Sequence, residues 1–256
     1  MPVIEHIDAR GVVCLTLNRP ARHNALDAAL ISALGKHIDR LRKHPGLHTL
    51  VLTGAGSSFC SGADLHWLGQ AHGDEEAGRG LRPFATLLRQ LHELPLATIA
   101  RVNGPAYGGG LGLIACCDFA IAVEQARFAF TELRLGLVPA MIAPYVIART
   151  GGHQARRYFL RAERFDARQA RDSGLIDEVC AAGQLDTAVE TLLQSLLQAG
   201  PEALAECKRL LSQICPVSAD VTQQATKTSA RVAASAEARE GIRAFLQKSR
   251  PDWAPN

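Results

Sequence analysis

The chain of 256 residues has no apolar run of the roughly 18 residues that a membrane-spanning helix requires, so no such helix is expected. Its net charge of +3 is too small to indicate binding to nucleic acid or to a membrane surface. No basic stretch followed by an apolar core opens the sequence, which therefore predicts no signal peptide. With 47% hydrophobic and 21% charged residues, the composition is that of a globular protein.

The seven cysteines are an odd number and contain no CxxC spacing, which argues against a disulfide framework and against a zinc site. Cys116 and Cys117 lie in an apolar run, where thiols are expected to pack as small hydrophobic groups. We therefore expect a reducing, cytoplasmic setting and no bound metal. A modest group of basic residues is expected to form a solvated helix face: Arg149, Arg156, Arg157, Arg161 and Arg164.

Short apolar strands alternate with amphipathic helices over residues 1–185, which predicts an α/β fold. Strands are expected over 12–17, 49–53, 96–102, 119–123 and 127–130. Asp27 is a candidate N-cap for a helix reaching Leu41, and a second helix is expected over 83–94. The polar stretch 69–80 is predicted to be a mobile surface loop.

After about residue 185 the sequence carries few strand signals. Helices are expected there over 186–197, 202–213 and 221–248. This part lacks an obvious core of its own, which suggests that it packs on a neighbouring subunit. The predicted organisation is therefore a core over 1–185 and a helical region over 186–256.

Three consecutive glycines, 108–110, stand between a predicted strand and an apolar helix that runs to Cys117. Glycine lets the backbone turn sharply and approach a ligand closely. The first amides of a helix lack internal acceptors and carry partial positive charge, so this junction is suited to bind phosphate or to stabilise an oxyanion. It lacks GxGxxG, GK[ST] and GxSxG patterns, which excludes a dinucleotide fingerprint, a phosphate loop and a nucleophile elbow.

A second segment, 57–65, also passes from strand to helix through a glycine, with Asp64 at the start of the helix. Its charge is favourable at that helix end. The triplet alone is explained by close packing of a helix on a sheet. Two such loops, each aiming one backbone N–H at the same carbonyl oxygen, would instead form an oxyanion hole for a thioester.

These segments resemble the enoyl-CoA hydratase/isomerase, or crotonase, superfamily. The motifs that carry the resemblance follow the family order over nearly the whole chain: RHNAL, FCSGADL, VNGPAYGGGLGL, CDFAIA, FAFTELRLGLVP, AERFDARQARDSGLIDEV and EGIRAFLQKSRPDW. The resemblance implies a spiral of ββα units with a C-terminal helical region that forms trimers. Such trimers often pair into hexamers.

The resemblance also assigns roles to residues. The amides of Ala63 and Gly109 would hold the thioester oxygen, and Glu132, in an apolar segment that should raise its pKa, would act as acid and base. CoA is then part of the substrate, and no other cofactor is implied. Residues matching the CoA-binding positions are Arg22, His23, Ala25, Leu26, Ser61, Ala63, Asp64, Leu65, Phe245 and Lys248. Whether Arg22 or His23 meets a CoA phosphate stays open.

Gly112 aligns with the second catalytic glutamate of the family's hydratases. A glycine inside a helix costs about 1 kcal/mol relative to alanine, so it is unexpected unless space is needed. Hydration generally uses one group to activate water and another to protonate the α-carbon, whereas isomerases of the family move one proton with a single glutamate. Gly112 therefore leaves the reaction in question.

The stretch PAMIAPYV, 139–146, departs from the common hydratase pattern and resembles bacterial methylglutaconyl-CoA and isohexenylglutaconyl-CoA hydratases of leucine and acyclic-terpene breakdown. Those substrates carry a second carboxylate, which offers a route around the missing glutamate. Candidate polar partners for it are His66, Arg82, Tyr107 and Arg134.

Three functions follow from these motifs. The leading one is hydration or dehydration of a 2-enoyl-CoA, with a branched glutaconyl-CoA as the candidate substrate. The second is Δ3-Δ2 isomerisation of an enoyl-CoA by Glu132 alone. The third is CoA binding with little catalysis.

Overall fold

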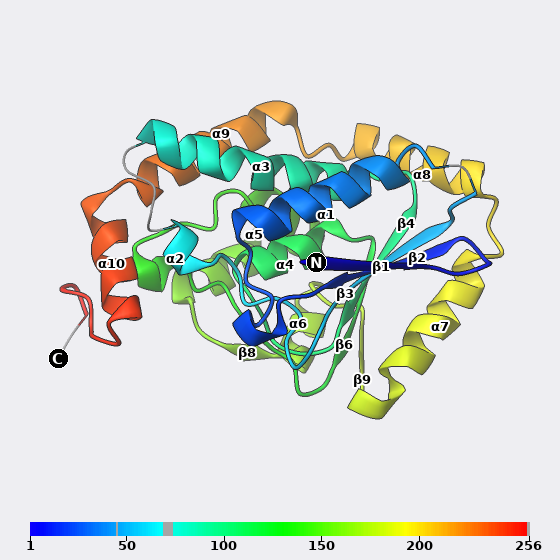
Figure 1. The fold of residues 1–256 in the computed structure, drawn as a ribbon, viewed down its shortest axis with the longest axis horizontal. Helices are drawn as coiled ribbons and strands as arrows, with labels where there is room; N and C mark the ends of the chain where they lie inside the picture. The colour runs from blue at the N-terminus through cyan, green and yellow to red at the C-terminus, as the bar shows by residue number, and fades with distance from the viewer. Residues whose placement is uncertain (45, 69–73, 255–256) are drawn as a thin grey trace.

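The computed structural model describes residues 1–44, 46–68 and 74–254, which form two sheets with helices packed around them (Figure 1). In the main sheet, of order β1-β2-β3-β4-β6-β9, β1 is antiparallel to β2 and the other neighbours are parallel. Its strands are β1 Val3–Ile7, β2 Val12–Leu17, β3 Thr49–Gly54, β4 Ala97–Val102, β6 Phe119–Val123 and β9 Glu178–Cys180. The smaller sheet is β5 Ala106–Tyr107, β7 Arg127–Ala129 and β8 Phe165–Asp166. The predicted α/β class is confirmed.

The helices cover the main sheet in layers. In Figure 1, α3 lies between α1 and α9 and packs on both, while α7 packs on β4 and β6. The α-helices are α1 Ala28–Leu41, α2 Leu65–Leu68, α3 Asp74–His92, α4 Gly109–Cys116, α5 Ala143–Arg161, α6 Ala167–Asp172, α7 Leu185–Leu196, α8 Pro201–Ile214, α9 Ala219–Ala233 and α10 Ala236–Leu246. Three short 3-10 helices are η1 Pro20–Arg22, η2 Glu132–Leu135 and η3 Ala182–Gln184.

Helix α1 forms as its sequence predicts. The Asp27 carboxylate accepts a hydrogen bond from the Leu30 amide at 2.8 Å, which satisfies one of the free amides of the first turn. The apolar positions at helical spacing are all buried against the sheet and α3: Leu30, Ile31, Leu34, Ile38 and Leu41. The N-cap assignment and the buried face are both confirmed.

Two predicted boundaries are wrong. The expected loop over 69–80 lies in part outside the described residues, and from Asp74 onward the chain is already helix α3. Packing of α3 between α1 and α9 overrides the weak helix propensity of this glycine-containing stretch. The single helix expected over 221–248 is broken at Ser235, whose hydroxyl accepts from the Ala238 amide at 3.1 Å and starts α10.

The basic cluster is a solvated face only in part. Arg156, Arg157, Arg161 and Arg164 are exposed, but Arg149 is largely buried. Its guanidinium donates to the carbonyl oxygens of Cys117 at 2.7 Å and Leu175 at 2.8 Å, and pairs with Asp177. Arg149 therefore ties α5 to the ends of neighbouring segments.

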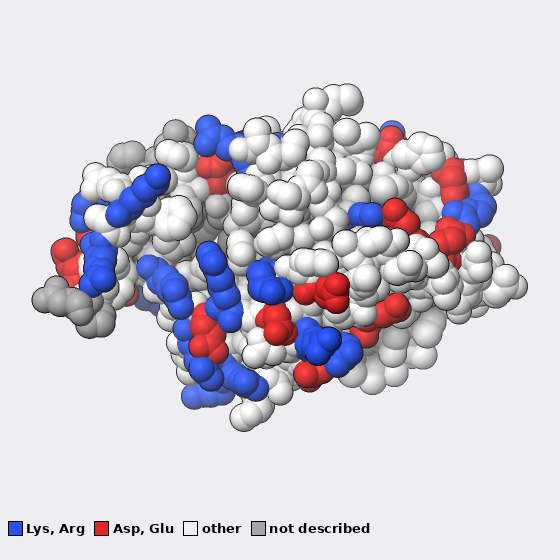
Figure 2. All heavy atoms as spheres, turned by 90° about the horizontal axis from the view of Figure 1, so that it is seen from below, with Lys and Arg blue, Asp and Glu red and all other residues white. Residues whose placement is uncertain are grey.

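On the face of the molecule that Figure 2 shows, basic and acidic side chains are interspersed.

The helices after residue 185 pack on the rest of the chain at several places. Leu185, Val189 and Leu193 of α7 belong to the main hydrophobic core. A smaller cluster joins η2 to α10 through Leu135 and Ile242. The division at residue 185 stays a prediction. Within the described residues, no helix is long and apolar enough to cross a bilayer.

Candidate active site

The two glycine-containing loops lie side by side, as the sequence predicts for a shared site. Loop 55–64, after β3, pairs with the segment that leads into α4. The Phe59 amide donates to the carbonyl oxygen of Pro105 at 3.0 Å, and the Tyr107 amide donates to that of Cys60 at 2.9 Å. A Cβ atom on Gly62, whose φ is +90°, would lie 2.9 Å from the Tyr107 carbonyl oxygen, so this close approach depends on glycine.

Two backbone amides at the junction of these loops have no backbone hydrogen-bond acceptor among the described residues. Leu26 pairs with both neighbours of Ala63: its amide donates to Gly62 at 2.8 Å, and its carbonyl accepts from Asp64 at 2.9 Å. In this parallel pairing the N–H and the carbonyl of Ala63 itself point away from Leu26. Gly109 is the first residue of α4, where a helix has no internal acceptor for its amide. In the described part of the chain neither amide has a backbone acceptor.

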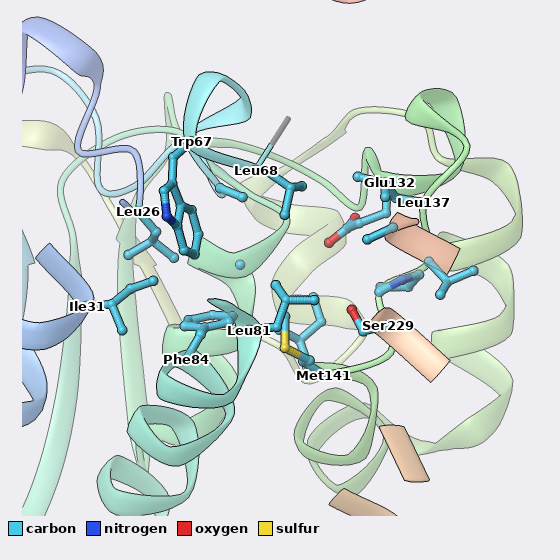
Figure 3. A pocket seen from close by; sticks show the side chains of 16 residues that line it. Leu26, Ile31, Trp67, Leu68, Leu81, Phe84, Glu132, Leu137, Met141 and Ser229 are labelled. Atoms are coloured by element: carbon cyan, nitrogen blue, oxygen red, sulfur yellow. The ribbon is translucent and has the colours of Figure 1, made fainter. Parts of the chain in front are cut away.

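Ala63, Gly109 and Glu132 line one pocket of about 600 Å³, counting its open mouth (Figure 3). Most of its wall is apolar and comes from α2, α3, the 137–142 segment and α9. The remaining lining residues are Leu26, Ile31, Trp67, Leu68, Leu81, Phe84, Leu137, Val138, Pro139, Met141, Ile142, Ser229 and Ala233. The pocket therefore surrounds one carboxylate and two unpaired amides with hydrocarbon.

Glu132 begins η2, directly after a segment that buries Phe128 and Phe130 in the core. Its Oε2 atom is buried and has no hydrogen-bond partner among the described residues. Because burial disfavours the charged form, the pKa of Glu132 rises to about 7. A Cβ atom on Gly108 would lie 3.0 Å from Oε1, so the carboxylate lies against the turn that starts α4.

At Gly112, which we predict to align with the second glutamate of the family's hydratases, a neighbour fills the space of a side chain. An ideal Cβ atom on Gly112 would lie only 2.2 Å from Cγ2 of Ile142 and 3.4 Å from Cδ2 of Leu88. Ile142 is buried and lines the pocket. The glycine thus makes room for an isoleucine side chain from the 139–146 stretch, and a methyl group occupies the place that a side chain at 112 would take.

The family model described as enoyl-CoA hydratase/isomerase matches residues 8–256. The chain belongs to this family. The 2,3-dehydroadipyl-CoA hydratase of Escherichia coli K12 is 35% identical over 252 residues, 94% of each chain. An enoyl-CoA hydratase structure from Mycobacterium avium has a TM-score of 0.86 and 34% identity, covering 99% of both chains.

The chain is therefore an enzyme of the hydratase/isomerase family, and the crotonase superfamily predicted from its motifs is confirmed. Among its relatives is also the 1,2-epoxyphenylacetyl-CoA isomerase of Escherichia coli K12, 29% identical over 256 residues, which are 98% of this chain and 97% of that one. Hydratases and isomerases both occur among these relatives, so membership of the family does not distinguish between the two reactions.

The predicted CoA-binding residues of the enzyme fall in different places. Arg22 and His23 are exposed beside the loop of Ser61, whose amide donates to the His23 carbonyl at 3.0 Å. Ala25 is buried, Leu26 lines the pocket, and Asp64 and Leu65 are partly exposed. Phe245 and Lys248 lie on the surface at the end of α10, outside the pocket lining. Contact of these residues with CoA stays a prediction.

The candidate partners for a second substrate carboxylate do not line the described pocket. His66, Arg82 and Arg134 are exposed, and the Tyr107 ring lies under the guanidinium of Arg164 at 5.9 Å. Sequence reasoning also missed most of the wall, including Trp67, Phe84, Ile142 and Ser229. No local sequence signal marks Ile142 or Ser229 as part of the wall, because both reach the pocket through the packing of segments that are distant along the chain.

Arg19 connects the two segments that position the Ala63 amide. Its guanidinium pairs with Asp27 at 3.0 Å and with Asp64 at 3.2 Å, and it donates to the carbonyl of Ala25. Asp64 directly follows Ala63, and its other oxygen accepts from the His66 amide at 3.2 Å. Arg19 is therefore placed to fix the loop that carries the proposed oxyanion donor.

We predict that Arg19→Met lowers kcat about tenfold while KM changes little, because the Ala63 amide loses its fixed direction. Arg10→Met is the matched control, since Arg10 also holds two acidic residues, Asp8 and Glu190, but on an exposed surface. Steady-state kinetics of both variants check this. Equal kcat values for the two variants would contradict a positioning role for Arg19.

Proposed function

We propose that the enzyme adds water to the double bond of a 2-enoyl-CoA thioester and catalyses the reverse dehydration. One observation carries this proposal: two backbone amides with no backbone acceptor among the described residues line the same apolar pocket as one buried carboxylate. Acyl-CoA is the expected ligand of the family, and its thioester oxygen is the group that paired amides are suited to bind.

The Ala63 and Gly109 amides would donate to the thioester oxygen. As water adds to the β-carbon, negative charge moves onto this oxygen and forms an enolate. Fixed donors in a pocket with little water stabilise such charge strongly, because they need no reorientation during the reaction. The N-terminus of α4 adds its partial positive charge at Gly109.

Glu132 would transfer the protons. A pKa of about 7 allows the carboxylate to accept a proton from water and the acid to return it to the α-carbon at neutral pH. Since the same proton is taken and returned, the glutamate ends the cycle unchanged. A second carboxylate is then not needed for proton balance, which is compatible with Ile142 beside Gly112.

Branched glutaconyl-CoA thioesters remain the proposed substrates. This choice of substrate is supported by the resemblance of the 139–146 stretch to hydratases that act on glutaconyl-CoA thioesters of this kind. No cationic side chain lines the described pocket, and burying an unpaired carboxylate there is costly. The proposal therefore requires the apolar part of the acyl group to fill the pocket and its carboxylate to lie at the mouth, in water.

Assembly into a trimer or hexamer is part of the proposal. Several large apolar side chains on α8, α9 and α10 are exposed in the single chain: Leu210, Leu211, Ile214, Val221, Phe245 and Leu246. Such exposure supports contact of the C-terminal region with a second copy. We also propose that the enzyme is cytoplasmic.

Incubation of the purified enzyme with crotonyl-CoA and with 3-methylglutaconyl-CoA tests the reaction. We expect the absorbance of the enoyl thioester to fall with at least one of them, and the product to carry ¹⁸O when the water is labelled. No turnover of either substrate would contradict hydration.

Isomerisation is the second candidate, favoured by the absence of a carboxylate at position 112. An isomerase would convert a 3-enoyl-CoA to the 2-enoyl-CoA without incorporating ¹⁸O. A protein that only binds CoA would bind acyl-CoA without either conversion, and Glu132→Ala would change nothing.

A further inference from the structure

The hydroxyl of Ser229 is an unpaired polar group inside the pocket. Ser229 lies on α9, is only 8% exposed, and lines the pocket (Figure 3). Two other hydroxyls on α9 bond back to their own helix: Thr222 donates to Ala219 and Thr226 donates to Thr222, each at 2.8 Å. In the described residues Ser229 makes no such bond, so its hydroxyl is free to bind a molecule in the pocket.

Two oxygens without a hydrogen-bond partner among the described residues thus share one apolar pocket: Ser229 Oγ and the buried Glu132 Oε2. Figure 3 shows both side chains directed into it. A buried polar group without a partner costs about 1–3 kcal/mol. Among the other described lining side chains, Trp67 has an indole N–H, which donates but does not accept, and Met141 has a thioether sulfur, which accepts only weakly. A water held in such a pocket needs at least two polar partners, and these two oxygens supply them.

We propose that Ser229 is a catalytic residue, which together with Glu132 holds the water that attacks the β-carbon. This inference rests on the proposed hydration. It is carried by two observations: the Ser229 hydroxyl has no hydrogen-bond partner among the described residues, and Ser229 lines the same pocket as the carboxylate. It also accounts for how one glutamate suffices: the serine hydroxyl orients the water that a second carboxylate would otherwise hold.

The step balances without any further reagent. The water points one hydrogen at the Glu132 carboxylate and the other at Ser229 Oγ. The bond from the water oxygen to the β-carbon forms as the first hydrogen moves to Glu132, and the electron pair of the double bond moves to the thioester oxygen. Glu132 then protonates the α-carbon, the thioester carbonyl is restored, and the product hydroxyl keeps the hydrogen that faced Ser229.

Ser229→Ala separates this role from a structural one. We expect kcat for hydration to fall about 10- to 100-fold, because the water loses one of two partners. Exchange of the α-hydrogen of butyryl-CoA in D2O needs Glu132 and the oxyanion hole but no attacking water. It should therefore stay within about twofold of the wild-type rate. Ser229→Thr, which keeps a hydroxyl, should recover part of the hydration rate.

Ser212→Ala is the matched control, because this exposed serine on α8 bonds, within the described residues, only to the Lys208 carbonyl. It should leave both rates unchanged. Wild-type hydration in Ser229→Ala would overturn the inference and leave the proposed function standing, and so would an equal fall in hydration and exchange. A wild-type enzyme that exchanges the α-hydrogen but hydrates neither test substrate overturns the proposed function, and this inference with it.

Discussion

Replacing Glu132 by Gln is expected to lower the hydration rate about 100- to 10,000-fold and to stabilise the folded enzyme at pH 8. Activity is lost because the amide neither accepts the proton of water nor returns one to the α-carbon. The loss should not arise from misfolding, since Gln has the shape of Glu and carries no charge into the apolar pocket. Steady-state hydration kinetics measure the first effect.

The gain in stability follows from the raised pKa of Glu132. Burial lifts this pKa from 4.5 to about 7, so the folded state holds the proton more tightly than the unfolded state. The stability associated with that proton is fully present below pH 4.5 and is lost as pH rises through about 7. Glu132→Gln removes this loss, which amounts to about 3 kcal/mol at pH 8 and about 1 kcal/mol at pH 5.

Urea unfolding of the wild type and Glu132→Gln at both pH values measures this difference. The free energy of unfolding should favour the variant, and more so at pH 8. A difference that is the same at both pH values would mean that the carboxyl is not titrating in an apolar site.

Replacing Gly112 by Glu is expected to destabilise the enzyme and to lower hydration, although it adds the second carboxylate of the family's hydratases. The new Cβ atom would lie 2.2 Å from Ile142 Cγ2, so the helix or Ile142 has to move. Overpacking of this kind costs about 1–3 kcal/mol, and burying a carboxylate adds to it. For a chain of this size the melting temperature should fall by about 10 °C.

Gly35→Glu is the matched control, a glycine in α1 whose Cβ would meet only the Gln90 side chain, at 3.6 Å. It should leave the melting temperature nearly unchanged. Adding Ile142→Ala to Gly112→Glu removes the 2.2 Å contact with Cγ2 and leaves the contact with Cβ at 3.0 Å. The double variant should therefore lose less stability than the sum of the losses in the two single variants. A gain in crotonyl-CoA hydration by Gly112→Glu alone, with an unchanged melting temperature, would contradict the account of Ile142.

Features that depend on neighbouring residues were predictable from the sequence. Asp27 caps α1 because its carboxylate reaches an amide three residues on, and the glycines of the two loops mark sharp strand-to-helix turns. Both arise within a short stretch of chain, where spacing and residue type determine the geometry. The direction of the Glu132 pKa shift was predicted from the apolar segment around it, although distant elements also form the pocket wall that buries the carboxylate.

Features that depend on distant packing were not predictable. Ile142 lies far from Gly112 along the chain, and only the fold brings its methyl group to the place of the missing side chain. Ser229 reaches the pocket because α9 packs on α3. The start of α3 at Asp74 likewise reflects packing on α1 and α9, which a local reading of polar residues does not contain.

In the proposed reaction a single carboxylate, Glu132, moves protons on a thioester held by the Ala63 and Gly109 amides. Exchange of the α-hydrogen of butyryl-CoA in D2O, followed by NMR across pH, measures this step without depending on the natural substrate. We predict exchange that rises with pH, is half-maximal near the Glu132 pKa of about 7, and is lost in Glu132→Gln. Exchange by Glu132→Gln at the wild-type rate would contradict the claim.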